Sequence, residues 1–477
     1  MTSEFYEKLG NLLGAERVMN DDFALYAVHA DAGFEKGGFA SAIAKPCSTE
    51  DVAAVMRLAN EYKVPVTVRG GASSAAAGAT PTVPGGLILD MTDMTRLIEV
   101  NYDCSTITAQ AGITFGEMAA FLHPKGYTIC LGGHAVYTAT LGGCIANTSV
   151  SIGSGYYGMF GDQVINITAV TPTGEIVHTG SDSMRAGGRF LRYCNGPDLA
   201  GLFIAGTGVL GIITEATIRL HVMPETREYA CYSFDDIYKG TQASIELERA
   251  GIFDGQIAFG DHTLKVFGAG KPGNPIPGNC QLLFRCSLAG DKLVVDHQLK
   301  KLDAIAESFG GICLGPKLAI PVTYDIMGTE FSKLRVNGVS APIACAVPIK
   351  KIPELTEIVE SYLAENDRLI ENIKGSELKS WTNAGVVSHG GVISYAGRIT
   401  FTENPEHREE AYQVWHALLE KMIEMGGCPY WTGKTWTPHM ARGYRDDYLA
   451  FFKSLKAFMD PNNILNPGLL LEELDKQ

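Results

Sequence analysis

Three glycine-rich segments, each next to a short β-branched strand, limit what this chain can fold into more than any other feature. The first, Arg69–Gly78, follows the strand-like run Val64–Arg69. The second is Thr140–Gly158, and the third, Ala205–Leu220, is a glycine turn that feeds an alternating strand. Such small residues let successive backbone N–H groups point into one concavity, which can bind a phosphate without cationic side chains. Each segment alone is either a set of tight turns or a phosphate loop, but three together favour one extended cleft.

Motifs and charge exclude several classes of protein. No segment is a GK[ST] phosphate loop or a GxGxxG turn that opens a helix, so classical nicotinamide binding has no support. Lys and Arg number 39 against 53 Asp and Glu, and the formal net charge of −14 opposes binding to nucleic acid or anionic lipid. No run of about 18 apolar residues occurs, and Met1–Asn20 lacks the pattern of a signal peptide. We therefore expect a cytoplasmic protein with no nucleic-acid partner and no membrane span.

The hydrophobic pattern changes near Pro224. From about Ala42 to Met223, short strands alternate with helices in an α/β or α+β pattern. Beyond Pro224, helical and strand-like runs predict a second unit with antiparallel strands, and long helices are predicted at Pro405–Met425 and Tyr444–Met459. Eleven cysteines are scattered without a CxxC pair, which predicts reduced thiols and no structural zinc or iron–sulfur cluster.

Seven motifs carry a resemblance to a known family. In chain order they are V-x-V-R-G-G-A-S-S, L-D-M-T-D-M-T-R-L, I-T-A-Q-A-G-I-T, T-L-G-G-C-I-A-N, G-x-x-G-D-Q-V, G-T-G-V-L-G-I-I-T-E-A-T and D-P-N-N-I-L-N-P-G. From about Ala42 to Leu470 the chain resembles the FAD-linked oxidase family. That family has the vanillyl-alcohol-oxidase or PCMH-type flavoprotein fold and includes glycolate and D-lactate dehydrogenases. Seven motifs in the same order are far more specific than a single glycine motif.

The resemblance implies an α+β fold in three parts. A PCMH-type FAD-binding domain of two α/β subdomains would occupy residues 1–223. A cap domain with an antiparallel sheet covered by helices would occupy residues 224–425. Residues 426–477 would return to the FAD-binding domain.

The same resemblance implies which residues hold FAD. The pyrophosphate would lie against Arg69, Gly70, Gly71, Ala72, Ser73 and Ser74. The ribityl chain and the flavin would lie along Thr140, Leu141, Gly142 and Gly143, and the adenosine end against Gly206, Gly208, Val209 and Ile213. Asn147 is also assigned to cofactor binding. Asn466 would reach the flavin from the tail. Several relatives bond the flavin to a histidine in the first loop, where this chain has Ser73, so we expect non-covalent FAD.

The substrate side matches the family less well. His389 is the one group in its segment that titrates near neutrality, so it is the candidate base for a substrate hydroxyl. Arg335 and Arg398 are candidates for holding an anionic substrate. Phenol-oxidising relatives instead have an acid or base where Asp162 stands and a phenolate-binding residue where Tyr430 stands. Hydroxy-acid relatives bind a divalent metal through two His and one Glu, of which only His389 is kept, so we expect no metal.

These patterns predict an FAD-dependent dehydrogenase or oxidase acting on the CH–OH group of a small molecule, with hydride transfer to flavin N5. A 2-hydroxy acid and a phenol or other alcohol both stay open as substrates. A flavin-carrying electron-transfer subunit of a larger dehydrogenase complex is the alternative. An electron-transfer flavoprotein is a candidate electron acceptor, and a homodimer is compatible with the sequence.

Overall fold

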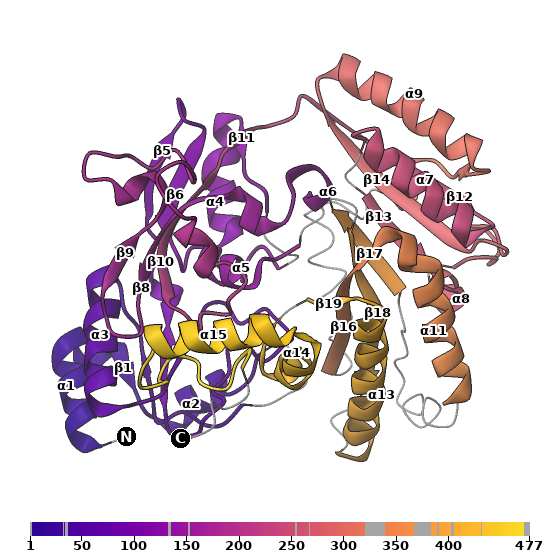
Figure 1. The fold of residues 1–477 in the computed structure, drawn as a ribbon. Helices are drawn as coiled ribbons and strands as arrows, with labels where there is room; N and C mark the ends of the chain where they lie inside the picture. The colour runs from indigo at the N-terminus through magenta and orange to yellow at the C-terminus, as the bar shows by residue number, and fades with distance from the viewer. Residues whose placement is uncertain are drawn as a thin grey trace. The chain divides into compact units, whose positions relative to one another are not determined.

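The computed structural model describes residues 2–31, 33, 37–131, 135–150, 153–252, 255–266, 268–319, 339–366, 383–388, 391–401, 405–430 and 432–471. They form two compact units (Figure 1). The N-terminal unit is built from Met1–Ser149, Phe160–Val222 and Trp431–Gln477, and the central unit from Val150–Met159 and Met223–Tyr430. The chain therefore passes from one unit to the other four times. The short segment Val150–Met159 belongs to the central unit although both of its flanks belong to the N-terminal one.

A four-stranded sheet organises the start of the N-terminal unit, in the order β1-β2-β4-β3. Its elements are β1 (Val18–Met19), β2 (Ala42–Ala44), β3 (Val66–Arg69), β4 (Leu87–Asp90), α1 (Ser3–Leu13), α2 (Asp22–Val28) and α3 (Thr49–Tyr62). Strands β2, β4 and β3 are parallel. Side chains alternate between the faces of a strand, so Ala42 and Ala44 pack with α1 and α3, whereas Ile43 packs with α2. Ser48 caps α3 as predicted, because its hydroxyl accepts the N–H of Asp51.

The second sheet of this unit is antiparallel, in the order β5-β6-β10-β8-β9. Its strands are β5 (Leu97–Asn101), β6 (Thr106–Gln110), β8 (Val164–Val170), β9 (Ile176–His178) and β10 (Ile212–Arg219), and a separate pair joins β7 (Tyr127–Thr128) to β11 (His221–Val222). Two described α-helices of this unit lie between β6 and β8 in the sequence, α4 (Phe115–Leu122) and α5 (Leu141–Asn147). Helix α5 forms inside the segment that the glycine pattern predicts as a loop, because Thr140 caps its first turn.

The C-terminal tail completes the first sheet. Helices α14 (Thr437–Gly443) and α15 (Asp446–Met459) precede it. Leu465 then forms a parallel bridge with Val66 of β3, and the N–H of Asn466 donates to the carbonyl of Val66 at 2.8 Å. Leu465 and Asn466 therefore run beside the strand that leads into the first glycine loop.

The central unit is an eight-stranded antiparallel sheet, in the order β15-β12-β14-β13-β17-β18-β16-β19. Its strands are β12 (Thr226–Phe234), β13 (Gly255–Phe259), β14 (Leu282–Gly290), β15 (Ile312–Cys313), β16 (Val339–Pro348), β17 (Asn383–Ser388), β18 (Gly391–Phe401) and β19 (Cys428–Pro429). Its helices are α6 (Ser154–Tyr157), α7 (Ile237–Arg249), α8 (Asp261–Val266), α9 (Lys292–Ser308), α11 (Ile352–Glu365) and α13 (Pro405–Glu424). Helices α7 and α9 pack on β12 and β14, α13 packs on β16 and β18, and α11 lies between α7 and α13 (Figure 1).

The predicted fold class is confirmed: the chain is α+β, and its central unit is an antiparallel sheet covered by helices. The predicted helix Pro405–Met425 is observed as α13, and the predicted helix Tyr444–Met459 as α15. Among the helices that the structure describes, none has the length and apolar character needed to span a bilayer.

Candidate functional site

The first glycine loop leaves the end of β3, and Arg69 holds its base. The guanidinium Nη1 donates to three backbone carbonyls, those of Val28, Ala30 and Ala79, at 3.1–3.2 Å. Burial lowers the pKa of Arg69 from its usual value, although Asp90 and Asp31 oppose the shift. The side chain therefore ties both ends of the loop to the segment after α2.

Between these ends, the loop presents its backbone. In the described part of the chain, the N–H groups of residues 71–75 donate no hydrogen bond. Ala72 has a left-handed backbone (φ 45°), which is typical of a turn whose N–H groups converge. A carboxylate closes the far side, because Asp31 accepts the N–H of Ala77 at 2.8 Å. Half-buried N–H groups that have no acceptor among the described residues suit the oxygens of a pyrophosphate.

The second glycine segment packs directly on the first. A Cβ on Gly71 would lie 1.6 Å from the carbonyl oxygen of Thr138, so only glycine allows this approach. Leu141 and Gly142 donate their N–H groups to the carbonyls of Ile113 and Ala111, at 2.9 and 2.8 Å. These bonds fix the start of α5 against the rest of the N-terminal unit.

At the other end of α5, two buried oxygens have no hydrogen-bond partner among the described residues. The Oδ1 atom of Asn147 is buried and has no hydrogen-bond partner among the described residues, and the same holds for the hydroxyl of Thr148. A buried polar atom without a partner is costly and marks a place for a ligand or water. Cys144, inside the same helix, is buried, and burial raises the pKa of its thiol to about 12, so it is not a nucleophile at neutral pH.

The third glycine segment and the tail meet the first two. The N–H groups of Ala205 and Thr207 donate to the carbonyls of Ile145 and Ala146, at 3.1 and 2.9 Å. Val209 and Ile213 are buried at 0% and 7% exposure. From the tail, Gly433 lies so close to the first loop that a Cβ there would be 2.2 Å from the carbonyl oxygen of Ala76.

Close contacts and hydrogen bonds join the first loop to Thr140, the end of α5 to the turn at Thr207, and Asn466 to that turn, all within the N-terminal unit. That these residues bind FAD stays a prediction. Asn147 is the member with a buried oxygen to offer, whereas Arg69 serves to hold the loop. Sequence reasoning missed Asp31, Thr207 and Thr432, which bond to the loops through side chains. Thr207 stands inside a quoted motif, but the contact of its hydroxyl with Thr432, 225 positions away, leaves no local signal.

The residues assigned to substrate chemistry are placed less completely. His389 and Arg335 lie outside the described residues, and Arg398 is described only as part of the backbone of β18. Asp162 is exposed. Tyr430 is 6% exposed, and its hydroxyl oxygen accepts the N–H of Val150 at 2.7 Å. That bond ties the end of the central unit's last strand to the segment Val150–Met159.

Metal binding is not supported by the described side chains. Among them, no group of three His, Cys, Asp or Glu residues could hold a metal ion. His389 is not included in that set. The absence of a metal centre stays a prediction.

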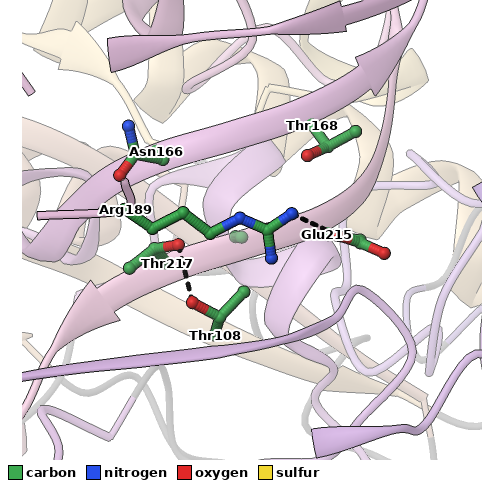
Figure 2. A pocket seen from close by; sticks show the side chains of 7 residues that line it. Thr108, Asn166, Thr168, Arg189, Glu215 and Thr217 are labelled. Atoms are coloured by element: carbon green, nitrogen blue, oxygen red, sulfur yellow. Dashed lines mark hydrogen bonds and ion pairs between the residues drawn. The ribbon is translucent and has the colours of Figure 1, made fainter. Parts of the chain in front are cut away.

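A small pocket lies on the five-stranded sheet, and Figure 2 shows its lining side chains. Arg189 crosses it, donating to Glu215 at 3.0 Å and to Asp182 at 3.2 Å, while Thr108 and Thr217 bond to each other at 2.9 Å. Two carboxylates neutralise this arginine, so the pocket offers no cation to an anionic ligand.

The glycine loops define a flavoprotein with two domains. Residues 40–180 match the FAD binding domain model, and residues 223–470 match the model of the C-terminal domain of FAD linked oxidases. The chain belongs to the FAD-linked oxidase family and is an FAD-dependent oxidoreductase.

Two curated relatives extend over most of the chain. It is 25% identical to a glycolate oxidase subunit of Bacillus subtilis, over 98% of this chain and 97% of the relative. It is 31% identical to the mitochondrial D-lactate dehydrogenase [cytochrome] 1 of Saccharomyces cerevisiae, over 90% of this chain and 72% of the relative. Among solved structures, p-cresol methylhydroxylase with substrate bound superposes with a TM-score of 0.84 at 17% identity, covering 99% and 97% of the two chains. That likeness confirms the predicted PCMH-type fold.

Proposed function

We propose that this protein oxidises the CH–OH group of a small 2-hydroxy acid. Two observations support the proposal. The N–H groups of residues 71–75 have no acceptor among the described residues, and the relatives of this chain are named for glycolate and D-lactate. The loop would hold the FAD pyrophosphate by N–H donors and by the close approach of backbone at Gly71. No cationic side chain is needed for this binding.

Bound FAD would supply the acceptor for the hydride that leaves the substrate carbon. The chain would supply the rest. His389 would take the hydroxyl proton, and Arg335 or Arg398 would hold the substrate carboxylate. Asn147 would offer its buried Oδ1 to a donor on the ribityl chain or the flavin. Ser73, in place of the histidine that bonds the flavin in several relatives, would leave FAD non-covalently bound.

A phenol or another alcohol is the less supported substrate. Tyr430, the candidate for phenolate binding, already uses its hydroxyl oxygen to accept the N–H of Val150. Asp162, the candidate acid or base of that chemistry, is exposed. The bond of Tyr430 and the exposure of Asp162 therefore give no support to phenol chemistry.

One comparison supports a second candidate function. The Bacillus subtilis relative is named as a subunit, so a flavin-carrying role within a larger dehydrogenase complex is the alternative. A partner such as an electron-transfer flavoprotein would then receive the electrons. The two candidates differ in whether the isolated chain reduces its own flavin with substrate.

Anaerobic mixing of the FAD-loaded protein with glycolate, D-lactate, L-lactate and 4-methylphenol tests the proposal. We expect a hydroxy acid to bleach the flavin absorbance and the phenol to leave it unchanged. Bleaching by the phenol alone would contradict the assignment of substrate class. No bleaching by any hydroxy acid, together with rapid reoxidation of chemically reduced flavin by an electron-transfer flavoprotein, would favour the electron-transfer subunit.

A further inference from the structure

We propose that Asn466 is a positioning residue whose side-chain amide fixes the spacing between the first and third glycine loops and so slows the loss of FAD. The proposal rests on the proposed placement of FAD in those loops. It differs from the family-based expectation that Asn466 reaches the flavin, because the amide is directed at two backbone groups of the protein. Asn466, Thr207 and Thr432 are called the clamp below.

Asn466 is buried, with 2% of its surface exposed. Its Oδ1 accepts the N–H of Val68 at 3.0 Å, and its Nδ2 donates to the carbonyl of Thr207 at 2.9 Å. Val68 is in β3, the strand that delivers the first loop, and Thr207 is the turn of the third segment. One planar amide therefore joins two loops that are separated by more than a hundred residues in the sequence.

Thr207 is where the remaining contacts converge. Its hydroxyl lies 2.7 Å from the carbonyl oxygen of Thr432 and 2.8 Å from the hydroxyl of Thr432. Its N–H donates to Ala146 at the end of α5, next to the unpaired Oδ1 of Asn147. The clamp thus links the first loop, the third loop, the tail and the helix of the second segment.

Two residues of the clamp have an unusual backbone conformation. Asn466 and Thr207 both have left-handed φ angles, of 45° and 48°. Asparagine tolerates that region better than other side chains do, while threonine does not favour it. Hydrogen bonds to Ala146, Asn466 and Thr432 together hold Thr207 in a conformation that the isolated segment would avoid.

The hydrogen bonds of the clamp and those of Arg69 fix the first loop to different segments. Arg69 ties the loop to the segment after α2, and Asn466 ties the strand before the loop to the third segment. Without the amide, the N–H of Val68 and the carbonyl of Thr207 would lose their buried partners. The first loop would then be less ordered before FAD binds. Part of the free energy of FAD binding would be used to order the N–H groups proposed to hold the pyrophosphate. We expect FAD to dissociate about ten- to a hundredfold faster, the range set by one or two lost buried hydrogen bonds.

Three variants test the clamp. Asn466→Gly keeps the left-handed φ and removes both bonds. Asn466→Asp keeps the shape and the acceptor for Val68 but turns an oxygen toward the carbonyl of Thr207. Asn463→Gly is the matched control, because Asn463 has a φ of 47° in the same turn and its side chain makes no hydrogen bond to a described residue.

The measurement is the rate at which the folded holoprotein releases FAD, followed by the fluorescence of free FAD after dilution. Both Asn466 variants should release FAD at least tenfold faster than the wild type and Asn463→Gly. The absorption spectrum and midpoint potential of the FAD-saturated variants should match the wild type. A changed potential at saturation would show that Asn466 touches the flavin and would overturn the proposal, as would a wild-type release rate.

Asn466→Asp adds a readout that a merely structural role would not move. A protonated carboxyl donates a hydrogen bond as the amide does, so release should slow again as the pH falls through the pKa of the new carboxyl. Two charged groups lie next to this turn, Lys456 of α15 and Asp460 at the end of that helix; they are paired with each other at 2.6 Å and neutralise one another. A flat pH profile in this variant, with release as fast as in Asn466→Gly, would contradict the role of the donor.

Two further variants separate the possible failures. Thr432→Val removes one hydroxyl of the clamp, and we expect about threefold faster release; a wild-type rate would count against the clamp even if the Asn466 variants do not fold. Gly71→Ala tests the placement of FAD, because the added Cβ would collide with Thr138. If Gly71→Ala binds FAD normally, the placement itself is wrong. If Gly71→Ala loses FAD while the clamp variants keep it, only the clamp is wrong.

Discussion

Replacement of Lys456 by methionine should destabilise the N-terminal unit by about 3–5 kcal/mol, the usual effect of removing one partner of a buried ion pair. The ammonium group lies under the C-terminal turn, with 4% of the side chain exposed, and Asp460 opposite it has 1% exposed. Lys456 donates to Asp460 at 2.6 Å and to the carbonyls of Val209 and Leu465 at 2.9 and 2.8 Å. Each of the three ammonium hydrogens therefore has an acceptor.

The magnitude follows from what the methionine would leave behind. The Asp460 carboxylate would keep the N–H groups of Ile464 and Leu465, at 3.0 and 2.9 Å, but would lose its ion pair with the Lys456 ammonium. Two buried carbonyls would also lose their donor. Since domains unfold with only about 5–15 kcal/mol, the loss is a large fraction of the total.

Removing both charges should lower the free energy of unfolding by less than removing one. Burial lowers the pKa of Lys456 although Asp460 opposes the shift, so desolvation of the ammonium outweighs its pairing. The double variant Lys456→Met/Asp460→Asn keeps an amide oxygen for the turn and leaves no unpaired charge. We expect it to recover at least half of the free energy lost in the single variant.

Urea unfolding of the apoprotein at neutral pH, followed by near-UV circular dichroism, measures these differences without the contribution of bound FAD. Lys453→Met, on the same helix but partly exposed, is the control and should change the free energy of unfolding by less than about 0.5 kcal/mol. A loss below about 1 kcal/mol for Lys456→Met, or a double variant as unstable as the single one, would refute this account of the pair.

Three other predictions concern the cofactor and the chemistry. Acid precipitation should leave the yellow flavin in the supernatant, because Ser73 cannot form the histidyl bond of several relatives; flavin in the pellet would contradict this. Treatment with a chelator should leave activity unchanged, and stoichiometric zinc or manganese in elemental analysis would show that the prediction of no metal is wrong. His389→Asn should keep the flavin spectrum and lower the rate of flavin reduction by about two to four powers of ten, the range for a lost general base; reduction at the wild-type rate would exclude His389 as the base.

The parts of the fold that the sequence predicts well are those fixed by local patterns. Ser48 and the apolar face that follows it determine α3, and the glycines after Arg69 determine the first loop. Helix α5 was predicted as part of a loop because its glycines disfavour a helix. Its stability comes from contacts that no local pattern contains, above all those of Leu141 and Gly142 with the carbonyls of Ile113 and Ala111.

The same distinction applies to the candidate site. A run of small residues after a strand predicts a turn with converging N–H groups. The residues from Gly70 to Ser74 could therefore be identified from the sequence as a candidate phosphate loop. The family resemblance assigns Arg69 to the pyrophosphate as well, but its guanidinium bonds to the carbonyls of Val28 and Ala30, which belong to no motif. Side chains that act on distant backbone, such as those of Asp31 and Thr207, leave no pattern in the sequence near the loop.

The long separation between partners has a consequence for how this site forms. Val68 and Asn466 are 398 positions apart, and Thr435 reaches the carbonyl of Ala76 across 359. The first loop cannot gain these bonds until the tail has been made and has returned to β3. Contacts between distant segments form only after the entropy of closing the intervening chain has been overcome. Until then, the glycine-rich loop can adopt many backbone conformations, because the Asn466 amide does not yet restrain it. If the first loop binds FAD as proposed, cofactor binding requires the closed N-terminal unit, in which Thr435 and Asn466 bond to the first loop and to the strand before it.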